Sequence, residues 1–131
     1  MKHHNQEAVR FIQALPKAEL HLHLEGTIRP AIYLTLAKRN KISLPAVNET
    51  DIKQLLQFKD FPTFLDAFMK LSEVIRTGKD IEDIVYDLGE QLARQNIIYA
   101  EIMISIAQYW RRGLPIDELI HGAYSGAIRV S

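Results

Sequence analysis

The chain of 131 residues is long enough for one compact domain, and its 16 basic and 16 acidic residues give a formal net charge of zero. This balance offers no electrostatic attraction for nucleic acid or an anionic membrane, and no apolar run is long enough to span a bilayer. The absence of cysteine excludes disulfides and thiolate ligands, and residues 1–10 carry no hydrophobic export segment, so we expect a cytoplasmic protein.

Hydrophobic periodicity and turn residues predict the elements of the first half of the chain. Residues 18–24 alternate alanine or leucine with glutamate or histidine, which is typical of a strand with one apolar and one polar face. Pro30 suits the first turn of a helix, with Thr27 or Arg29 as its cap. In chain order we expect a helix over 6–14, a strand over 18–24, a helix over 30–40, a loop over 41–49, and a short helix over 50–58 capped by Thr50 or Asp51.

The second half of the chain predicts two longer amphipathic helices, a second strand and a last helix. The helix over 61–75 has apolar residues mostly three or four positions apart, namely Phe61, Phe64, Leu65, Phe68, Leu71, Val74 and Ile75. We expect Asp80 to cap a helix that continues to about Gln95, and the apolar run over 97–106 to form a strand. The last helix starts at Pro115.

The order of these elements indicates an α/β fold, because two strands separated by long helical segments favour parallel pairing. Two parallel strands do not complete a sheet, since each has an unpaired edge and parallel sheets are normally covered on both faces. We therefore expect residues 1–131 to be the beginning of a larger, incomplete domain.

The most informative chemistry lies in LHLHLEG, residues 20–26. Side chains at i and i+2 of a strand project from the same face, so we expect His21 and His23 to point together, roughly 7 Å apart along the strand. Two imidazoles at this separation chelate one divalent ion such as zinc, iron or nickel. The alternative is that both histidines lie on the solvated face of a half-exposed strand, which is the commoner outcome for a bare His-x-His pattern.

The context of the histidine pair favours the metal. The strand comes early in an α/β chain and is followed by an acid, a glycine and a helix, and sites in α/β folds form at the carboxyl ends of strands. Two ligands are only part of a catalytic zinc site, which takes three protein ligands and an open position. We expect His121, in the last helix, to be a surface or half-buried residue and not a ligand.

The segment LPKAELHLHLEGTIRP, residues 15–30, closely resembles the first-strand signature of the adenosine and adenine deaminases, a family of the amidohydrolase superfamily. Three further segments are similar to the same family. These are FPTFLDAF at 61–68, similar to its apolar helix beside the substrate pocket, YAEI at 99–102, similar to its second barrel strand, and RGL at 112–114, similar to the turn before the next helix.

The resemblance implies a partial (β/α)8 barrel, in which this chain supplies the N-terminal portion with the first two parallel strands and inserted helices. His21 and His23 match the two zinc ligands of the first strand. Glu25 matches the acidic position that contacts the substrate, and Gly26 matches the glycine that lets the substrate approach the backbone. The apolar wall over the purine is matched by Phe61, Phe64, Leu65 and Phe68.

The resemblance also implies a reaction, in which Zn2+ activates water for attack on the purine carbon that bears the amino group, and ammonia leaves. Glutamate instead of aspartate at the position of Glu25 is seen more in adenine-type and other non-adenosine members of the family. Met103 and Ile106 depart from the family pattern, in which arginine and proline are common. The family's later zinc ligands, its proton-transferring glutamate and its water-orienting groups have no counterpart here, so we expect the isolated chain to be inactive.

Three other interpretations stay open at this point. The chain can belong to a different His-x-His amidohydrolase with another substrate. It can be a non-catalytic truncated fragment that self-associates through exposed strand edges. The aromatic residues of the 61–75 helix can be core alone, because aromatics at helical spacing usually are.

Overall fold

Helices and two strands follow one another along the chain in the computed structural model, which describes residues 2–44, 48–55 and 57–130. In chain order they are α1 (Lys2–Ala14), β1 (Lys17–His23), the short 3-10 helix η1 (Leu24–Thr27), α2 (Pro30–Arg39), α3 (Glu49–Leu55), α4 (Phe61–Glu73), α5 (Gly78–Arg94), β2 (Ile97–Met103), α6 (Ile106–Arg111) and α7 (Ile116–Val130). The loop expected over 41–49 includes residues 45–47, which lie outside the described residues, as does residue 56 of the helix expected over 50–58.

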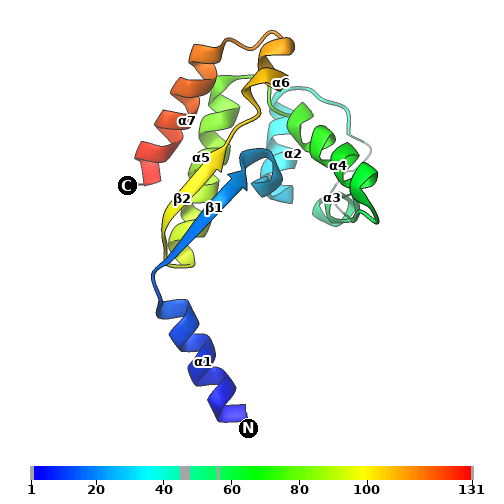
Figure 1. Ribbon diagram of the computed structural model, residues 1–131. Helices are drawn as coiled ribbons and strands as arrows, with labels where there is room; N and C mark the ends of the chain where they lie inside the picture. Colours follow the sequence, from blue (N-terminus) through cyan, green and yellow to red (C-terminus); the bar gives the residue numbers. More distant parts are fainter. Residues whose placement is uncertain (1, 45–47, 56, 131) are drawn as a thin grey trace.

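β1 and β2 form a two-stranded parallel sheet, as the element order predicts. Parallel strands need a long crossover connection, and here it contains α2 to α5, with α5 lying beside the sheet (Figure 1). The pairing runs from Lys17 opposite Ile97 to His23 opposite Met103. The carboxyl ends of the two strands therefore finish together, at the end of the sheet nearest to α4 and α6 (Figure 1).

α5 and α7 pack side by side through glycines (Figure 1). A Cβ atom added at Gly122 would collide with the carbonyl group of Gly78, and one added at Gly126 would collide with the carbonyl oxygen of Glu82. The backbones of the two helices therefore approach each other more closely than larger residues permit. This close approach fixes α7 as an outer layer on α5.

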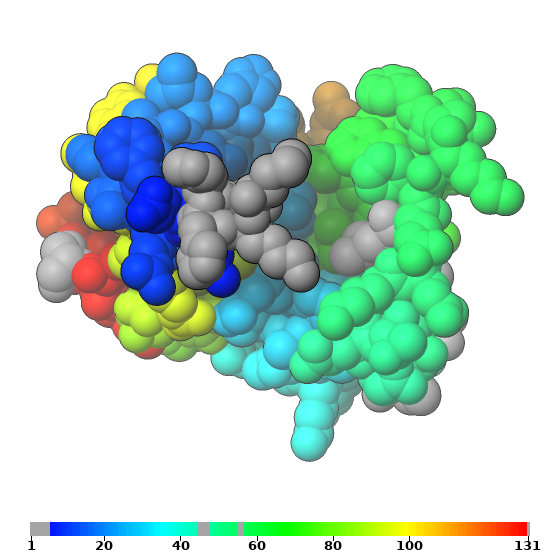
Figure 2. All heavy atoms as spheres, turned by 90° about the horizontal axis from the view of Figure 1, so that it is seen from below, coloured from blue at the N-terminus to red at the C-terminus, as the bar shows by residue number. Residues whose placement is uncertain are grey.

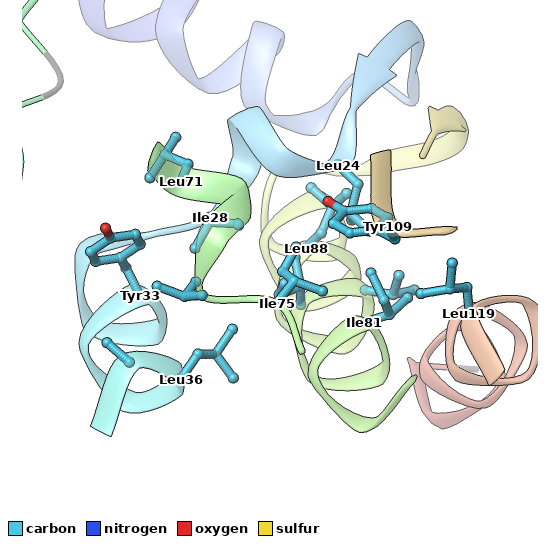
Figure 3. Packing of buried hydrophobic residues seen from close by; sticks show 14 of the residues in the cluster. Leu24, Ile28, Tyr33, Leu36, Leu71, Ile75, Ile81, Leu88, Tyr109 and Leu119 are labelled. Carbon is cyan, nitrogen blue, oxygen red and sulfur yellow. The ribbon is translucent and has the colours of Figure 1, made fainter. Parts of the chain in front are cut away.

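The core lies between the crossover helices and the ends of the strands. Figure 3 shows two groups of side chains, with Ile28, Tyr33, Leu36 and Leu71 between α2 and α4, and Leu24, Ile75, Ile81, Leu88, Tyr109 and Leu119 around α5. Burying each such aliphatic side chain stabilises the fold by roughly 1.5–3 kcal/mol. Because Leu24 follows β1 directly and is fully buried, the end of β1 is held by the core.

Asp80 is a buried polar centre in the crossover, with no exposed surface. Its Oδ2 accepts hydrogen bonds from the backbone N–H groups of Arg76 and Thr77 and from Asn40 Nδ2, each at 2.9 Å. Its Oδ1 accepts from Arg39 Nη1 at 3.0 Å. One carboxylate thus joins the end of α2, the loop after α4 and the first turn of α5.

The second strand is shorter than its sequence predicts. β2 ends at Met103, whereas the prediction extends to residue 106, and the backbone turns at Ser105 into α6. The apolar run continues through Ile106, so hydrophobicity alone does not mark the change from strand to helix. A helix of six residues is also too short to show a helical period.

The helix caps also differ from the sequence predictions. Thr77, not Asp80, caps α5, and Asp80 is its partner at the third helical position in a capping box. α3 begins at Glu49, and the side chain of Asn48 accepts a hydrogen bond from the N–H of Asp51 at 3.0 Å. The predicted cap at Arg29 is confirmed for α2, without a side-chain hydrogen bond.

α1 leaves the sheet at the amino-terminal ends of the strands and projects from the body (Figure 1). Viewed from below, α1 (dark blue) stands in front of β1, and α3 and α4 (green) form the opposite margin (Figure 2). Asn96 Nδ2 donates a hydrogen bond to the carbonyl oxygen of Ala14 at 2.6 Å, and Lys17 Nζ donates to that of Leu15 at 2.7 Å.

Within the described residues, no helix is both long and apolar enough to cross a membrane.

We predict that Asp80→Asn lowers the free energy of unfolding by roughly 3 kcal/mol, because it places an amide donor among backbone and side-chain donors and removes the buried one of the two carboxylates that pair with Arg39. Thermal and urea unfolding followed by circular dichroism measure the change. Asp66→Asn, on the exposed face of α4, is the matched control and should change stability by less than about 0.5 kcal/mol. Equal losses in the two variants would contradict the role given to Asp80.

Candidate functional site

The carboxyl end of β1 presents two histidine rings side by side. The ring centroids of His21 and His23 are 5.2 Å apart, and both side chains are exposed. His21 has a left-handed backbone, with φ of 62°, and the pairing register shifts between Glu19 and Leu22. A bulge of this kind re-aims a side chain, so the strict alternation expected of the strand is interrupted here, and Leu20 is 61% exposed.

A row of aromatic rings leads from the histidines along α4. The ring of Phe68 meets that of His23 edge-on at a centroid distance of 6.0 Å. Phe64 lies 6.2 Å from Phe68, and Phe61 stacks on Phe64 at 6.2 Å. Phe61 is 69% exposed and Phe64 and Leu65 are exposed, whereas Ala67 and Leu71, later in α4, are buried. The first half of α4 is therefore not core in this chain.

A hollow of about 380 Å³ lies between the end of β1 and α4. Its lining is mainly apolar and consists of Leu22, His23, Gly26, Thr27, Phe64, Leu65, Phe68 and Ser105. A larger hollow of about 790 Å³ lies between α4 and α6 and also reaches Ser105, but no histidine lines it. We take the smaller one as the candidate site, because it joins an apolar surface suited to a planar ligand with a metal-binding side chain.

Glu25 lies behind this hollow with no exposed surface. Its Oε1 accepts a hydrogen bond from the hydroxyl of Tyr109 at 2.7 Å and from the backbone N–H of Ser105 at 2.9 Å. Its Oε2 is enclosed and has no hydrogen-bond partner among the described residues. The carboxylate thus ties the turn after β1 to the segment after β2, and one of its oxygens is left unpaired.

Tyr109 is completely buried, with its hydroxyl against this carboxylate. Figure 3 shows its ring beside Leu24. Burial, reinforced by the negative charge of Glu25, raises the pKa of Tyr109 well above its usual range. The hydroxyl therefore keeps its proton and remains a donor. On the other side, the guanidinium of Arg112 lies over the Tyr109 ring, 5.0 Å from its centroid, and donates to the carbonyl oxygen of Ser72 at 2.9 Å.

The structure brings most of the sequence-predicted site residues to one place. His21 and His23 lie together, and His23 and Gly26 line the hollow with Phe64, Leu65 and Phe68. Phe61 continues the aromatic row outside the hollow. Sequence reasoning missed Tyr109, which belongs to the short helix that it also missed. No local pattern marks a hydrogen bond between residues that are 84 positions apart.

The donor chemistry of the histidine pair fits zinc, because neutral imidazole nitrogens are common zinc ligands. The part of the chain described by the structure contains no group of three or more His, Cys, Asp or Glu residues that can hold a metal ion. His121 is exposed on α7, with Nε2 3.5 Å from the hydroxyl of Ser125. The pair therefore fits a partial zinc site with two ligands.

The chain belongs to the adenosine deaminase family, whose model matches residues 16–129. An adenine deaminase from Vibrio parahaemolyticus is 37% identical over 112 residues, which make up 86% of this chain and 33% of that protein. The crystal structure of an adenine deaminase from Arthrobacter aurescens matches with a TM-score of 0.83 and 32% identity, covering 89% of this chain and 36% of that one. An amidohydrolase from Burkholderia ambifaria, solved with bound Zn, matches in fold with a TM-score of 0.78 and 23% identity, covering 92% of this chain and 33% of that one.

The chain thus spans about a third of the length of the relatives that it matches. The predicted fold class is confirmed at this level. Two parallel strands with their helices correspond to deaminase barrel proteins over that third.

We predict that the chain loses stability as pH rises above about 10, the ordinary tyrosine pKa. The folded pKa of Tyr109 is raised, so above pH 10 the unfolded chain releases a proton that the folded chain retains, and unfolding becomes more favourable. Tyr109→Phe removes this contribution, so its free energy of unfolding should fall less steeply between pH 9 and 11. Urea unfolding at several pH values measures both slopes, and identical slopes would contradict the prediction.

Proposed function

We propose that residues 1–131 form the N-terminal part of the (β/α)8 barrel domain of a zinc-dependent deaminase, which hydrolyses the amino group of an aminopurine and releases ammonia. The observation that carries this proposal is the pair His21 and His23 at the carboxyl end of β1, next to an apolar hollow, in a chain of the adenosine deaminase family. The adenine deaminases among its relatives support the substrate class.

In this proposal His21 and His23 hold two of the coordination positions of zinc through their imidazole nitrogens. Zinc, when bound, acts as a Lewis acid that makes water a nucleophile near neutral pH. His23 is itself part of the lining of the hollow, so a zinc ion held by the pair would lie beside it. The attacked carbon of the substrate would therefore face the histidine pair.

The remaining site residues would bind the purine. Phe64, Leu65 and Phe68 offer an apolar wall for a planar ring, and Phe61 extends that wall outward. At Gly26 an added Cβ would meet no atom within 4 Å, so a ligand has room beside the backbone.

Glu25 supplies the acidic group beside Gly26. Its carboxylate is held at the turn that follows β1 by the hydrogen bonds from Tyr109 and Ser105. Glutamate at this position supports an adenine-type substrate over adenosine.

We propose that the chain alone has no turnover. Its described residues supply two imidazoles but no cluster of three metal-binding groups, and a catalytic zinc takes three protein ligands. The other ligands and the group that transfers the proton would come from the parts of the barrel that correspond to the remaining two thirds of the relatives.

Zinc titration of the chain, followed by the imidazole NMR signals, tests the histidine pair. The experiment uses a background in which His3 and His4 are replaced by glutamine, so that terminal histidines do not compete. We expect weak one-to-one binding, and a loss of roughly tenfold or more in affinity with either His21→Asn or His23→Asn. His121→Asn is the control and should change nothing. Zinc affinity that survives both substitutions in β1 would contradict the proposed ligands.

The gene sequence downstream of Ser131 tests the proposed enzyme. We expect it to encode a His-x-x-Glu motif and a later Asp-Asp pair, and a protein that includes them to release ammonia from adenine. A panel of aminopurines and amides separates this activity from that of another His-x-His amidohydrolase. An open reading frame without these motifs, or a longer protein that releases no ammonia from any aminopurine, would contradict the proposal.

Self-association is a second candidate function, and the accessible area of the chain favours it. The area is 8973 Å², whereas a monomeric globular protein of 15.1 kDa has about 7,100 Å². The difference of about 1,900 Å² per chain is more than the roughly 800 Å² that each partner buries in an interface of standard size. Ile98 and Tyr99 on β2 and Ile120 and Tyr124 on α7 are exposed. Sedimentation of the isolated chain decides the matter, because a monomer at all concentrations would exclude this function.

A further inference from the structure

The carboxyl group of Glu25 is buried, and only one of its two oxygens is hydrogen-bonded to the described residues. Its Oε1 accepts from Tyr109 and Ser105, and Oε2 accepts from no described residue. Enclosing an unpaired carboxylate oxygen costs free energy, and an apolar residue of similar volume would avoid that cost. The unpaired oxygen therefore points to a role beyond packing.

The neighbours of this carboxylate place it against the candidate site. His23 and Gly26, two residues before and one residue after Glu25, both line the hollow. Ser105, which donates to Oε1, lines it too. Because a Cβ at Gly26 would meet no atom within 4 Å, the turn that carries Glu25 has free space beside it. Within the described residues the fold occupies Oε1, so Oε2 is the acceptor left for an incoming donor.

We infer that Tyr109 is a positioning residue, which acts with the backbone N–H of Ser105 to fix the rotamer of Glu25, so that Oε2 is kept for an N–H donor of the purine. This inference rests on the proposed function, because it takes a purine as the ligand. It adds a specific role for α6, a helix that lines the neighbouring hollow and whose Tyr109 donates a hydrogen bond to Glu25.

Tyr109 is itself held in place, as a positioning residue must be. Arg112 covers its ring and donates hydrogen bonds to the carbonyl oxygens of Ser72 at 2.9 Å and Ile75 at 3.2 Å. Gln108 Nε2 donates to the hydroxyl of Ser72. α6 is thus tied to the end of α4, the helix that carries the apolar wall, and through Tyr109 to the carboxyl group of Glu25.

The test is an NMR titration of the 131-residue chain with adenine, following the amide signals of Gly26, Phe68 and Ser105. We expect saturable shifts for the unaltered chain. Tyr109→Phe removes only the hydroxyl, and it should weaken adenine binding roughly fivefold to tenfold, while the melting temperature changes by only a few degrees. Tyr124→Phe, an exposed tyrosine of α7, is the matched control and should bind as the unaltered chain does.

Glu25→Gln separates a ligand-binding role from a packing role and does not depend on the folding of the tyrosine variant. Glutamine keeps the shape and one oxygen for Tyr109 and Ser105, but it replaces the free acceptor by a donor. We expect adenine binding to be lost while the melting temperature is unchanged or higher. Unchanged binding in this variant, or equal affinities of Tyr109→Phe and the unaltered chain, would overturn the inference. If the unaltered chain binds no adenine, the purine site of the proposed function is contradicted as well. That result differs from the two variant results, in which the unaltered chain does bind adenine.

Discussion

The carboxylate of Asp80 is the interaction on which the arrangement of the crossover depends. Two parallel strands have no tight turn to hold them together, so the 73 residues between the last residue of β1 and the first residue of β2 must themselves fold to a fixed shape. Asp80 provides the common point for α2, the loop after α4 and the start of α5. The carbonyl oxygens of Ser72, in the last turn of α4, and of Ile75, in that loop, accept hydrogen bonds from Arg112, and Arg112 covers Tyr109. A continuous set of polar contacts therefore runs from the centre of the crossover to the end of the sheet.

The apolar residues of α4 have two different roles. Leu71 near its end and Val74 and Ile75 just after it are buried in the core, whereas Phe64 and Phe68 face the hollow beside His23. A single amphipathic stripe thus anchors the helix at one end and forms a wall at the other. The two interpretations of this stripe, core or pocket, each describe a different half of the helix.

The sequence predicted the parts of the structure that local patterns encode. The alternation in residues 18–24 located the first strand and the histidine pair, and helical periodicity located α4 and α5. It did not predict the bulge. The apolar and polar residue types alternate without a break through Leu20 and His21, although the backbone at His21 is left-handed. It also missed α6, because the apolar run of β2 continues into it without a break, and with α6 it missed the bond between Tyr109 and Glu25, which only the folded crossover brings together.

The left-handed backbone at His21 also limits how the metal preference of this strand can be redesigned. Among side chains that bind metals, histidine, aspartate and asparagine adopt this conformation most readily, so hard oxygen donors are the natural replacements at that position. The backbone at His23 is extended, with φ of −83° and ψ of 116°, and any L-residue tolerates it. A thiolate, which would turn the chelate toward softer ions, therefore belongs at position 23, and the two halves of the pair are not interchangeable as engineering sites.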